Sequence, residues 1–260
     1  MNRRLLVASD LDGTLLDATS GTWEPARAAL AALRERGVQL VPCSSKTRAE
    51  IEPLVREWGL GTPFIAENGG AVVFAEGATL VLGTPRADLV SALAAIAGET
   101  GAAVTSFASL RVEQVAELTG LTPRAATLAM DRHYDEPFLL PQPDFLAAVT
   151  QAATRRGLHV THGGRFHHLT GPHDKGSALR ELLSILERRG ERLATLGLGD
   201  AANDIPLLRV VEQRVLVPRP DGRLDSELAS AFPAARVAPA PGPAGWNAAV
   251  LAFLAQARDL

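Results

Sequence analysis

Short apolar runs alternate with amphipathic stretches in the first third of the chain. Residues 5–9 are almost wholly apolar and predict a buried strand, whereas residues 23–36 carry apolar side chains at helical spacing. Gly37 follows them, and glycine is typical of the position after a helix. Further segments of the same kind are residues 38–42, 48–58 and 64–66. Strands that alternate with helices are typical of a parallel sheet, so we expect an α/β fold with a Rossmann-like core.

The alternation changes near residue 85 and returns near residue 174. We therefore expect a core formed by residues 1–84 and 170–260, with residues 85–169 inserted as a second α/β domain, which the family resemblance described below implies is a cap over the active site. The proline-rich residues 233–243 predict an extended surface connector.

Composition limits the kinds of partner. The net charge of −3 and the pI near 6.1 argue against a nucleic-acid surface, so we expect a small-molecule partner. No apolar run approaches the roughly 18 residues that a membrane span needs, and Ser9 and Asp10 interrupt the first apolar run too early for a signal peptide. A single cysteine, Cys43, fits a reducing compartment. We expect a cytoplasmic protein without membrane or nucleic-acid partners, and its oligomeric state stays open.

Two carboxylates follow the first predicted strand. Asp10 and Asp12 flank Leu11 and precede Gly13-Thr14. Ligands of open α/β sheets bind beyond the carboxyl ends of the strands, where these side chains lie. Carboxylates this close repel each other unless a cation intervenes, which predicts Mg²⁺ bound by oxygen ligands. The alternative is that both aspartates only shape a turn.

A second acidic motif follows the predicted strand at residues 193–197. Residues 197–204 read Gly-Leu-Gly-Asp-Ala-Ala-Asn-Asp, and the glycines allow close approach of backbone and ligand. Asp200 and Asp204 are four residues apart and share a face of the predicted helix. A simple N-cap role for Asp200 is the alternative.

Lysine is rare in this chain, because only Lys46 and Lys175 occur among its 26 basic residues. Lys175 begins a predicted helix where the core pattern returns, and Lys46 lies in the segment Ser44-Ser45-Lys46-Thr47 after the predicted strand at residues 38–42. Both positions suit contacts with an anion. The alternatives are an ordinary surface lysine for Lys175 and simple capping of the next helix for residues 44–47.

Together these motifs resemble those of the haloacid dehalogenase superfamily. The resemblance implies that Asp10 attacks phosphorus, that Asp12 donates and accepts the proton, and that Lys175 neutralises negative charge. It further implies phosphate binding by Ser44, Lys175 and Asn203, and metal binding by Asp10, Asp12, Asp200 and Asp204. A magnesium-dependent phosphatase with an aspartyl-phosphate intermediate is therefore expected.

The segment at residues 44–47 resembles mannosyl-3-phosphoglycerate phosphatases, whereas wider relatives have Thr-Gly-Arg there. The cap contains further similar pieces at residues 119–126, 132, 136–138 and 163–168. This narrower resemblance implies hydrolysis of mannosyl-3-phosphoglycerate to mannosylglycerate, a compatible solute, and phosphate. It implies substrate contacts from Ser45, Lys46, Arg165, His167 and His168. The Arg165 guanidinium, a fork-shaped donor, suits a carboxylate.

Several alternatives stay open at this level. They are a phosphatase for glucosyl-3-phosphoglycerate or for sugar phosphates generally, a phosphomutase such as phosphomannomutase, and a binding protein without catalysis. Four histidines near the end of the cap raise a zinc site as a further alternative, although no cysteine accompanies them: His159, His162, His167 and His168.

Overall fold

The computed structural model describes residues 3–60, 63–163 and 166–256. Its core contains a parallel sheet with the strand order β12-β11-β10-β1-β2. The strands are β1 (Arg4–Ser9), β2 (Gln39–Pro42), β10 (Leu193–Gly199), β11 (Gln213–Leu216) and β12 (Arg236–Val237). The expected parallel α/β core is confirmed, and β12 lies within the segment expected to be only a connector.

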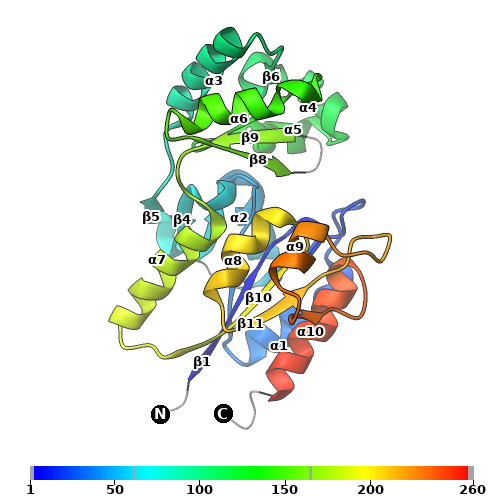
Figure 1. Cartoon of the computed structure of the whole chain (residues 1–260). Coiled ribbons are helices and arrows are strands. Elements are labelled where there is room, and N and C mark those ends of the chain that lie inside the picture. The colour runs from blue at the N-terminus through cyan, green and yellow to red at the C-terminus, as the bar shows by residue number, and fades with distance from the viewer. Residues whose placement is uncertain (1–2, 61–62, 164–165, 257–260) are drawn as a thin grey trace.

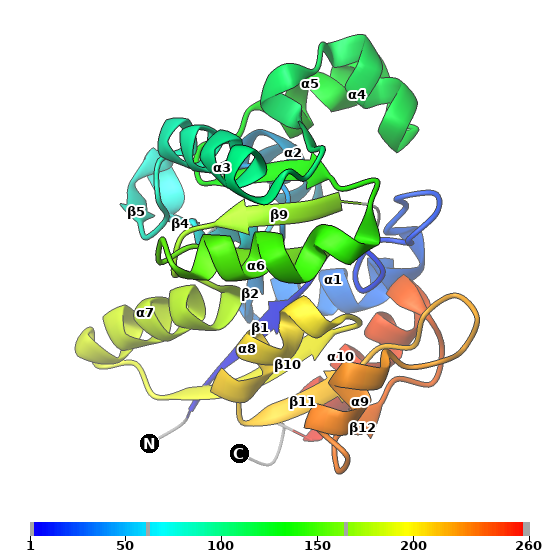
Figure 2. The ribbon, with the colours of Figure 1, turned by 45° about the horizontal axis from the view of Figure 1, so that its top comes forward.

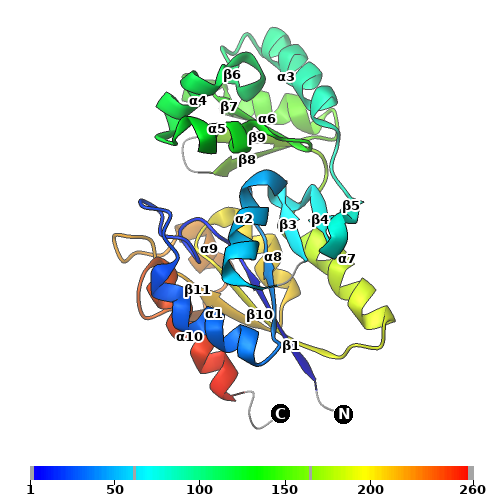
Figure 3. The ribbon, with the colours of Figure 1, turned by 180° about the vertical axis from the view of Figure 1, so that it is seen from behind.

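Helices cover both faces of this sheet because successive side chains of β1 point to opposite faces. Figures 1 and 3 show the helices that cover the two faces. Val7 packs with the helices of one face, and Leu6 and Ala8 pack with those of the other. The first group is α1 (Arg27–Glu35), α2 (Arg48–Trp58) and α10 (Gly242–Gln256). The second is α7 (Lys175–Arg188), α8 (Ile205–Val210) and α9 (Ser226–Ala231). Buried on both sides, the sheet forms a rigid support for the loops at its carboxyl edge.

A small antiparallel sheet leads from the core toward the cap. It consists of β3 (Phe64–Ala66), β4 (Ala71–Val73) and β5 (Thr79–Val81). An isolated bridge between Cys43 and Ile65 joins it to the end of β2.

The cap has its own sheet, with the order β6-β7-β9-β8 and antiparallel pairing throughout. Its strands are β6 (Thr105–Ser106), β7 (Asp135–Leu139), β8 (His159–Gly163) and β9 (Phe166–Thr170). Its helices are α3 (Arg86–Thr100), α4 (Val112–Thr119), α5 (Pro123–Met130) and α6 (Leu146–Thr154). Helices α3 and α6 pack on one face of the sheet (Figure 2), and a separate apolar cluster holds them there. The exact domain boundaries stay a prediction.

The cap lies over the end of the core at which β1 and β10 finish (Figure 1). Two segments of the chain connect core and cap, one near Thr84 and one near Gly171. They are packed tightly against each other, since a Cβ on Gly171 would lie 2.2 Å from the Thr84 hydroxyl oxygen. Within the described part of the chain, no helix is both long and apolar enough to cross a lipid bilayer.

Candidate active site

Three carboxylates meet at the carboxyl edge of the parallel sheet. Asp10 follows β1 and Asp200 follows β10, and the two strands are paired so that Ser9 lies opposite Leu198. Asp204 ends the short 3-10 turn η6 (Ala202–Asp204). One oxygen of each of Asp10, Asp200 and Asp204 lies within 4.8 Å of the others. The parallel register therefore brings together side chains almost 200 positions apart in the sequence.

Two glycines make this approach possible. A Cβ on Gly13 would lie 2.5 Å from Oδ2 of Asp200, and a Cβ on Gly199 would lie 2.5 Å from Cβ of Asp204. The Asp204 carboxylate is fixed further by the backbone N–H groups of Asp200 and Ala201, which donate to its Oδ2 at 3.0 and 3.1 Å. Any larger residue at either glycine would displace a carboxylate.

Lys175 bridges two of the three carboxylates, those of Asp10 and Asp204. It is the first residue of α7, its side chain is only 1% exposed, and its Nζ donates to Asp10 at 2.6 Å and to Asp204 at 2.7 Å. Burial by itself lowers the pKa of Lys175, but attraction to Asp10 and Asp204 outweighs it and raises the pKa above its ordinary value. The lysine is therefore a permanent cation.

The three carboxylates carry more negative charge than one ammonium can balance. Burial raises the pKa of Asp10 well above its ordinary value, repulsion from Asp204 raises it further, and Lys175 opposes both. Burial, followed by repulsion from Asp204, raises the pKa of Asp200 to about 6 although the Thr14 hydroxyl donates to it at 2.9 Å. A cluster of carboxylate oxygens with excess negative charge fits a hard divalent cation such as Mg²⁺.

Asp12 lies outside this group. Its carboxylate is 51% exposed, and its Oδ1 is 2.9 Å from Nζ of Lys46, whose other acidic neighbour is Glu50 at 3.8 Å. Its side chain turns toward Lys46 and is not part of the group of three carboxylates, and metal binding by Asp12 stays a prediction. The two lysines thus pair with different aspartates: Lys46 with Asp12, and Lys175 with Asp10 and Asp204.

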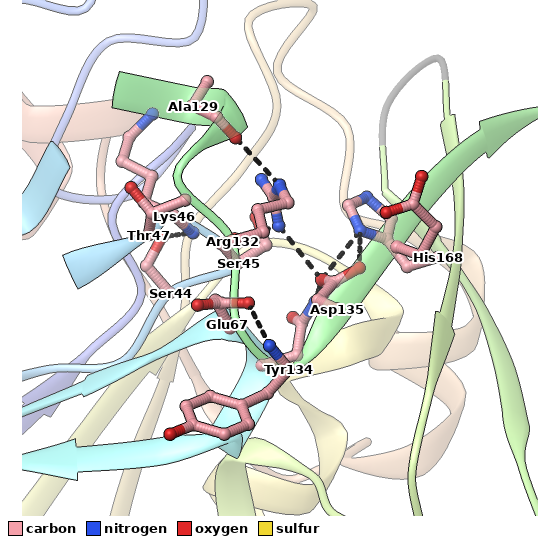
Figure 4. Close-up of polar contacts among 12 residues, drawn as sticks. Ser44, Ser45, Lys46, Thr47, Glu67, Ala129, Arg132, Tyr134, Asp135 and His168 are labelled. Atoms are coloured by element: carbon pink, nitrogen blue, oxygen red, sulfur yellow. Dashed lines mark hydrogen bonds and ion pairs between the residues drawn. The ribbon is translucent and has the colours of Figure 1, made fainter. Parts of the chain in front are cut away.

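The loop after β2 contacts the cap as well as the core (Figure 4). Ser44 is fully buried, and its hydroxyl oxygen accepts a hydrogen bond from the Lys46 backbone N–H at 3.1 Å. The Ser45 carbonyl accepts from Arg132 at 3.1 Å, and the Thr47 hydroxyl donates to the Leu128 carbonyl at 2.8 Å. Thr47 also caps α2, so the simple capping alternative holds for this residue.

Several cap residues of interest form internal contacts. His168 is 7% exposed, and its Nδ1 lies 2.9 Å from both oxygens of the buried Asp135. Arg132 donates to the Ala129 carbonyl at 3.0 Å and lies 3.2 Å from Asp135 (Figure 4). Glu136 is fully buried and accepts from Arg86 at 2.6 Å. These side chains support the cap and its contact with the core, and the atoms that make these contacts already have partners within the protein.

The other predicted cap contacts are placed differently. His167 is half-buried, with its ring 4.9 Å from that of His162 and 5.5 Å from that of Phe138. Arg165 lies outside the described residues. Among the residues that are described, the only group with three possible metal ligands is the aspartate cluster, and no histidine belongs to it.

A clamp between core and cap was missed from the sequence. Glu67 is 1% exposed, and its carboxylate accepts the backbone N–H groups of His133 at 3.0 Å and Tyr134 at 2.7 Å. Asn68 donates to Asp135 at 3.1 Å. Glu67 and Asn68 both have left-handed backbones, with φ of 49° and 56°, which is rare for residues other than glycine. The segment Glu67-Asn68-Gly69-Gly70 directly follows the apolar residues 64–66, but its partners lie more than 60 residues away, so no local pattern indicates the clamp.

Comparison with known proteins identifies the family of this chain. Residues 7–116 match the family model of haloacid dehalogenase-like hydrolases. A glucosyl-3-phosphoglycerate/mannosyl-3-phosphoglycerate phosphatase of Methanococcoides burtonii is 35% identical, covering 98% of this chain and 99% of its own. The phosphatase of the same name from Persephonella marina is 32% identical, covering 96% and 97%. The chain belongs to this family of phosphatases. It is a phosphoric monoester hydrolase of the haloacid dehalogenase superfamily, and the expected resemblance is confirmed.

Solved structures support the fold of this family member. A Thermoplasma acidophilum protein is similar with a TM-score of 0.74 at 18% identity, covering 98% of this chain and 99% of its own. A sugar phosphatase of haloacid dehalogenase subclass IIB is similar with a TM-score of 0.71 at 17% identity, covering 95% and 98%. At this identity the likeness concerns the arrangement of core and cap.

Proposed function

We propose that this phosphatase hydrolyses mannosyl-3-phosphoglycerate to mannosylglycerate and phosphate, with Mg²⁺, through a phosphorylated Asp10. The observation that carries the chemistry is the cluster of Asp10, Asp200 and Asp204, two of which, Asp10 and Asp204, are buried and bonded to Lys175. The substrate is supported by similarity over nearly the full length to relatives with that activity in their names. A cytoplasmic location fits the single cysteine but stays a prediction.

Asp10 and Asp12 have different roles in the proposed reaction. Asp10 attacks phosphorus with one carboxylate oxygen, and the bond between phosphorus and the C3 oxygen of the glycerate breaks. Asp12 gives its proton to that leaving oxygen. Asp12 then accepts a proton from the water that attacks phosphorus, which releases phosphate and restores Asp10.

Phosphate charge is balanced by fixed groups around Asp10. Lys175 already contacts Asp10 at 2.6 Å, and the buried Ser44 hydroxyl and the Asn203 amide suit the phosphate oxygens. Asp10, Asp200 and Asp204 would hold Mg²⁺, which supplies charge neutralisation to the phosphoryl group when bound. Lys46 lies next to Asp12 and is suited to the substrate carboxylate. The contacts expected from Ser45, Arg165, His167 and His168 stay predictions.

The test is phosphate release in the presence of Mg²⁺. Mannosyl-3-phosphoglycerate, glucosyl-3-phosphoglycerate and mannose phosphates are compared with wild type and Asp10→Asn. We expect the highest kcat/KM for the mannosyl compound and a loss of about a thousandfold or more in the variant. Faster release from an unrelated sugar phosphate would refute the substrate, and an active Asp10→Asn would refute the nucleophile.

A further inference from the structure

A cavity of about 310 Å³ lies between the cap and the core beside the candidate active site. Strands β8 and β9 of the cap contribute Thr161 and Thr170, and the core contributes Asn68, His173, Asn203 and Glu227. Lys175, whose ammonium donates to Asp10, lines it as well, so the cavity adjoins the candidate active site. A volume of this size suits a single sugar ring.

Two buried side chains of the cavity have polar atoms without a hydrogen-bond partner. His173 is 5% exposed, and neither of its ring nitrogens has a partner among the described residues. The Glu67 carbonyl lies near the ring but outside hydrogen-bonding geometry. Asn68 is 7% exposed, and its Oδ1 is also unpaired although its amide nitrogen donates to Asp135. Buried polar groups are nearly always paired, so two that line one cavity indicate a ligand with hydroxyl or water-like groups.

The charges around the cavity select the kind of ligand. Lys175 is the one cation among the described lining residues, and its ammonium is already bound by Asp10 and Asp204. Asp174 and Glu227 are acidic. Burial lowers the pKa of His173, so its ring is neutral near pH 7 and offers one donor and one acceptor. Apart from Lys175 and Asn203, which the proposed function assigns to the phosphate, the polar lining is acidic or neutral. It therefore disfavours a further phosphate or carboxylate and favours uncharged hydroxyl groups, which both donate and accept.

We propose that this cavity binds the hexose of the substrate, with His173 and Asn68 paired to its hydroxyl groups. The assignment rests on the proposed function. The phosphate then lies at Asp10 and Lys175, the glycerate joins it to the sugar, and the sugar hydroxyls pair the two orphaned side chains. His173 thus determines affinity for the sugar and takes no part in phosphoryl transfer.

The test compares a substrate that has the sugar with an analogue that lacks it. KM is measured for mannosyl-3-phosphoglycerate, and 3-phosphoglycerate is measured as a competitive inhibitor. His173→Phe keeps the ring volume but removes both nitrogens, so we expect its KM to rise about tenfold or more while the inhibition constant stays within about twofold. His173→Gln keeps a donor and an acceptor and is expected to restore most of the affinity. His133→Phe is the control, because the His133 side chain is 60% exposed.

A second variant blocks the cavity without removing a buried group. Thr161 is half-buried on β8, so Thr161→Phe should fold normally and still raise the KM for the sugar substrate about fivefold or more. This variant keeps the proposal testable if His173→Phe does not fold. An unchanged KM in the folded variants, or an equal rise of KM and of the inhibition constant, would overturn the sugar assignment alone. A wild type inactive on both glycosylated phosphoglycerates would overturn the proposed function and this assignment with it.

Discussion

Replacement of Lys175 by methionine should destabilise the protein strongly. The side chain is 1% exposed and its ammonium lies 2.6 and 2.7 Å from two buried carboxylates, so its removal leaves Asp10 and Asp204 close together without a cation. Breaking a buried ion pair by removing one partner costs about 3–5 kcal/mol. We expect a loss of that size in the free energy of unfolding at pH 7 without metal.

Lys46→Met is the matched control, because it removes the other lysine of the chain. Lys46 is 21% exposed and pairs with Asp12, which is 51% exposed, so water screens that contact. An exposed pair contributes about 1 kcal/mol or less. The two lysine variants should therefore differ several-fold in their effect on stability.

The assay is urea-induced unfolding of wild type and both variants, first with EDTA and then with Mg²⁺. A divalent cation neutralises the carboxylates, so Mg²⁺ should reduce the difference in unfolding free energy between Lys175→Met and wild type. A loss below about 1 kcal/mol for Lys175→Met in EDTA, or equal losses for the two variants, would refute the account of the buried cluster.

Three further predictions concern the clamp and the support of the site. Glu67→Ala leaves two backbone N–H groups without their acceptor and should lower the free energy of unfolding in urea by about 2–4 kcal/mol. Glu67→Gln should lower it less. Wild-type stability in the alanine variant would contradict the clamp. Gly69→Ala should lower kcat about tenfold, because its Cβ would lie 2.1 Å from the Asp174 carbonyl next to Lys175, whereas Gly101→Ala meets nothing within 4 Å and should leave kcat unchanged. Burial alone would raise the pKa of Asp135, but His168 and Arg132 lower it below its ordinary value. Its stabilisation is therefore present at neutral pH and lost as pH falls through that lowered pKa. The loss of unfolding free energy caused by Asp135→Asn should be largest near pH 7 and shrink as the solution is acidified through that pKa. A loss that is constant with pH would contradict this.

The sequence by itself determined the parallel core and the positions of its acidic motifs. Apolar runs followed by Asp10 and by Asp200 indicate strands whose carboxyl ends carry the chemistry, and parallel strands finish at one edge of a sheet. Local patterns of this kind need no knowledge of distant neighbours. The proline-rich connector shows the limit, since β12 forms there by pairing with β11 and not through any apolar pattern of its own.

Only the tertiary structure decided how the polar side chains are shared. Lys175 bonds Asp10, 165 positions away, and Glu67 bonds the backbone of Tyr134, 67 positions away. In the cap, Asp135 contacts both Arg132 and Nδ1 of His168, while His173 is left unpaired in a cavity. Whether His168 also contacts the substrate stays a prediction. The physical reason is that a polar group has few hydrogen-bonding directions, and which partners fill them depends on how core and cap dock, which no local periodicity encodes.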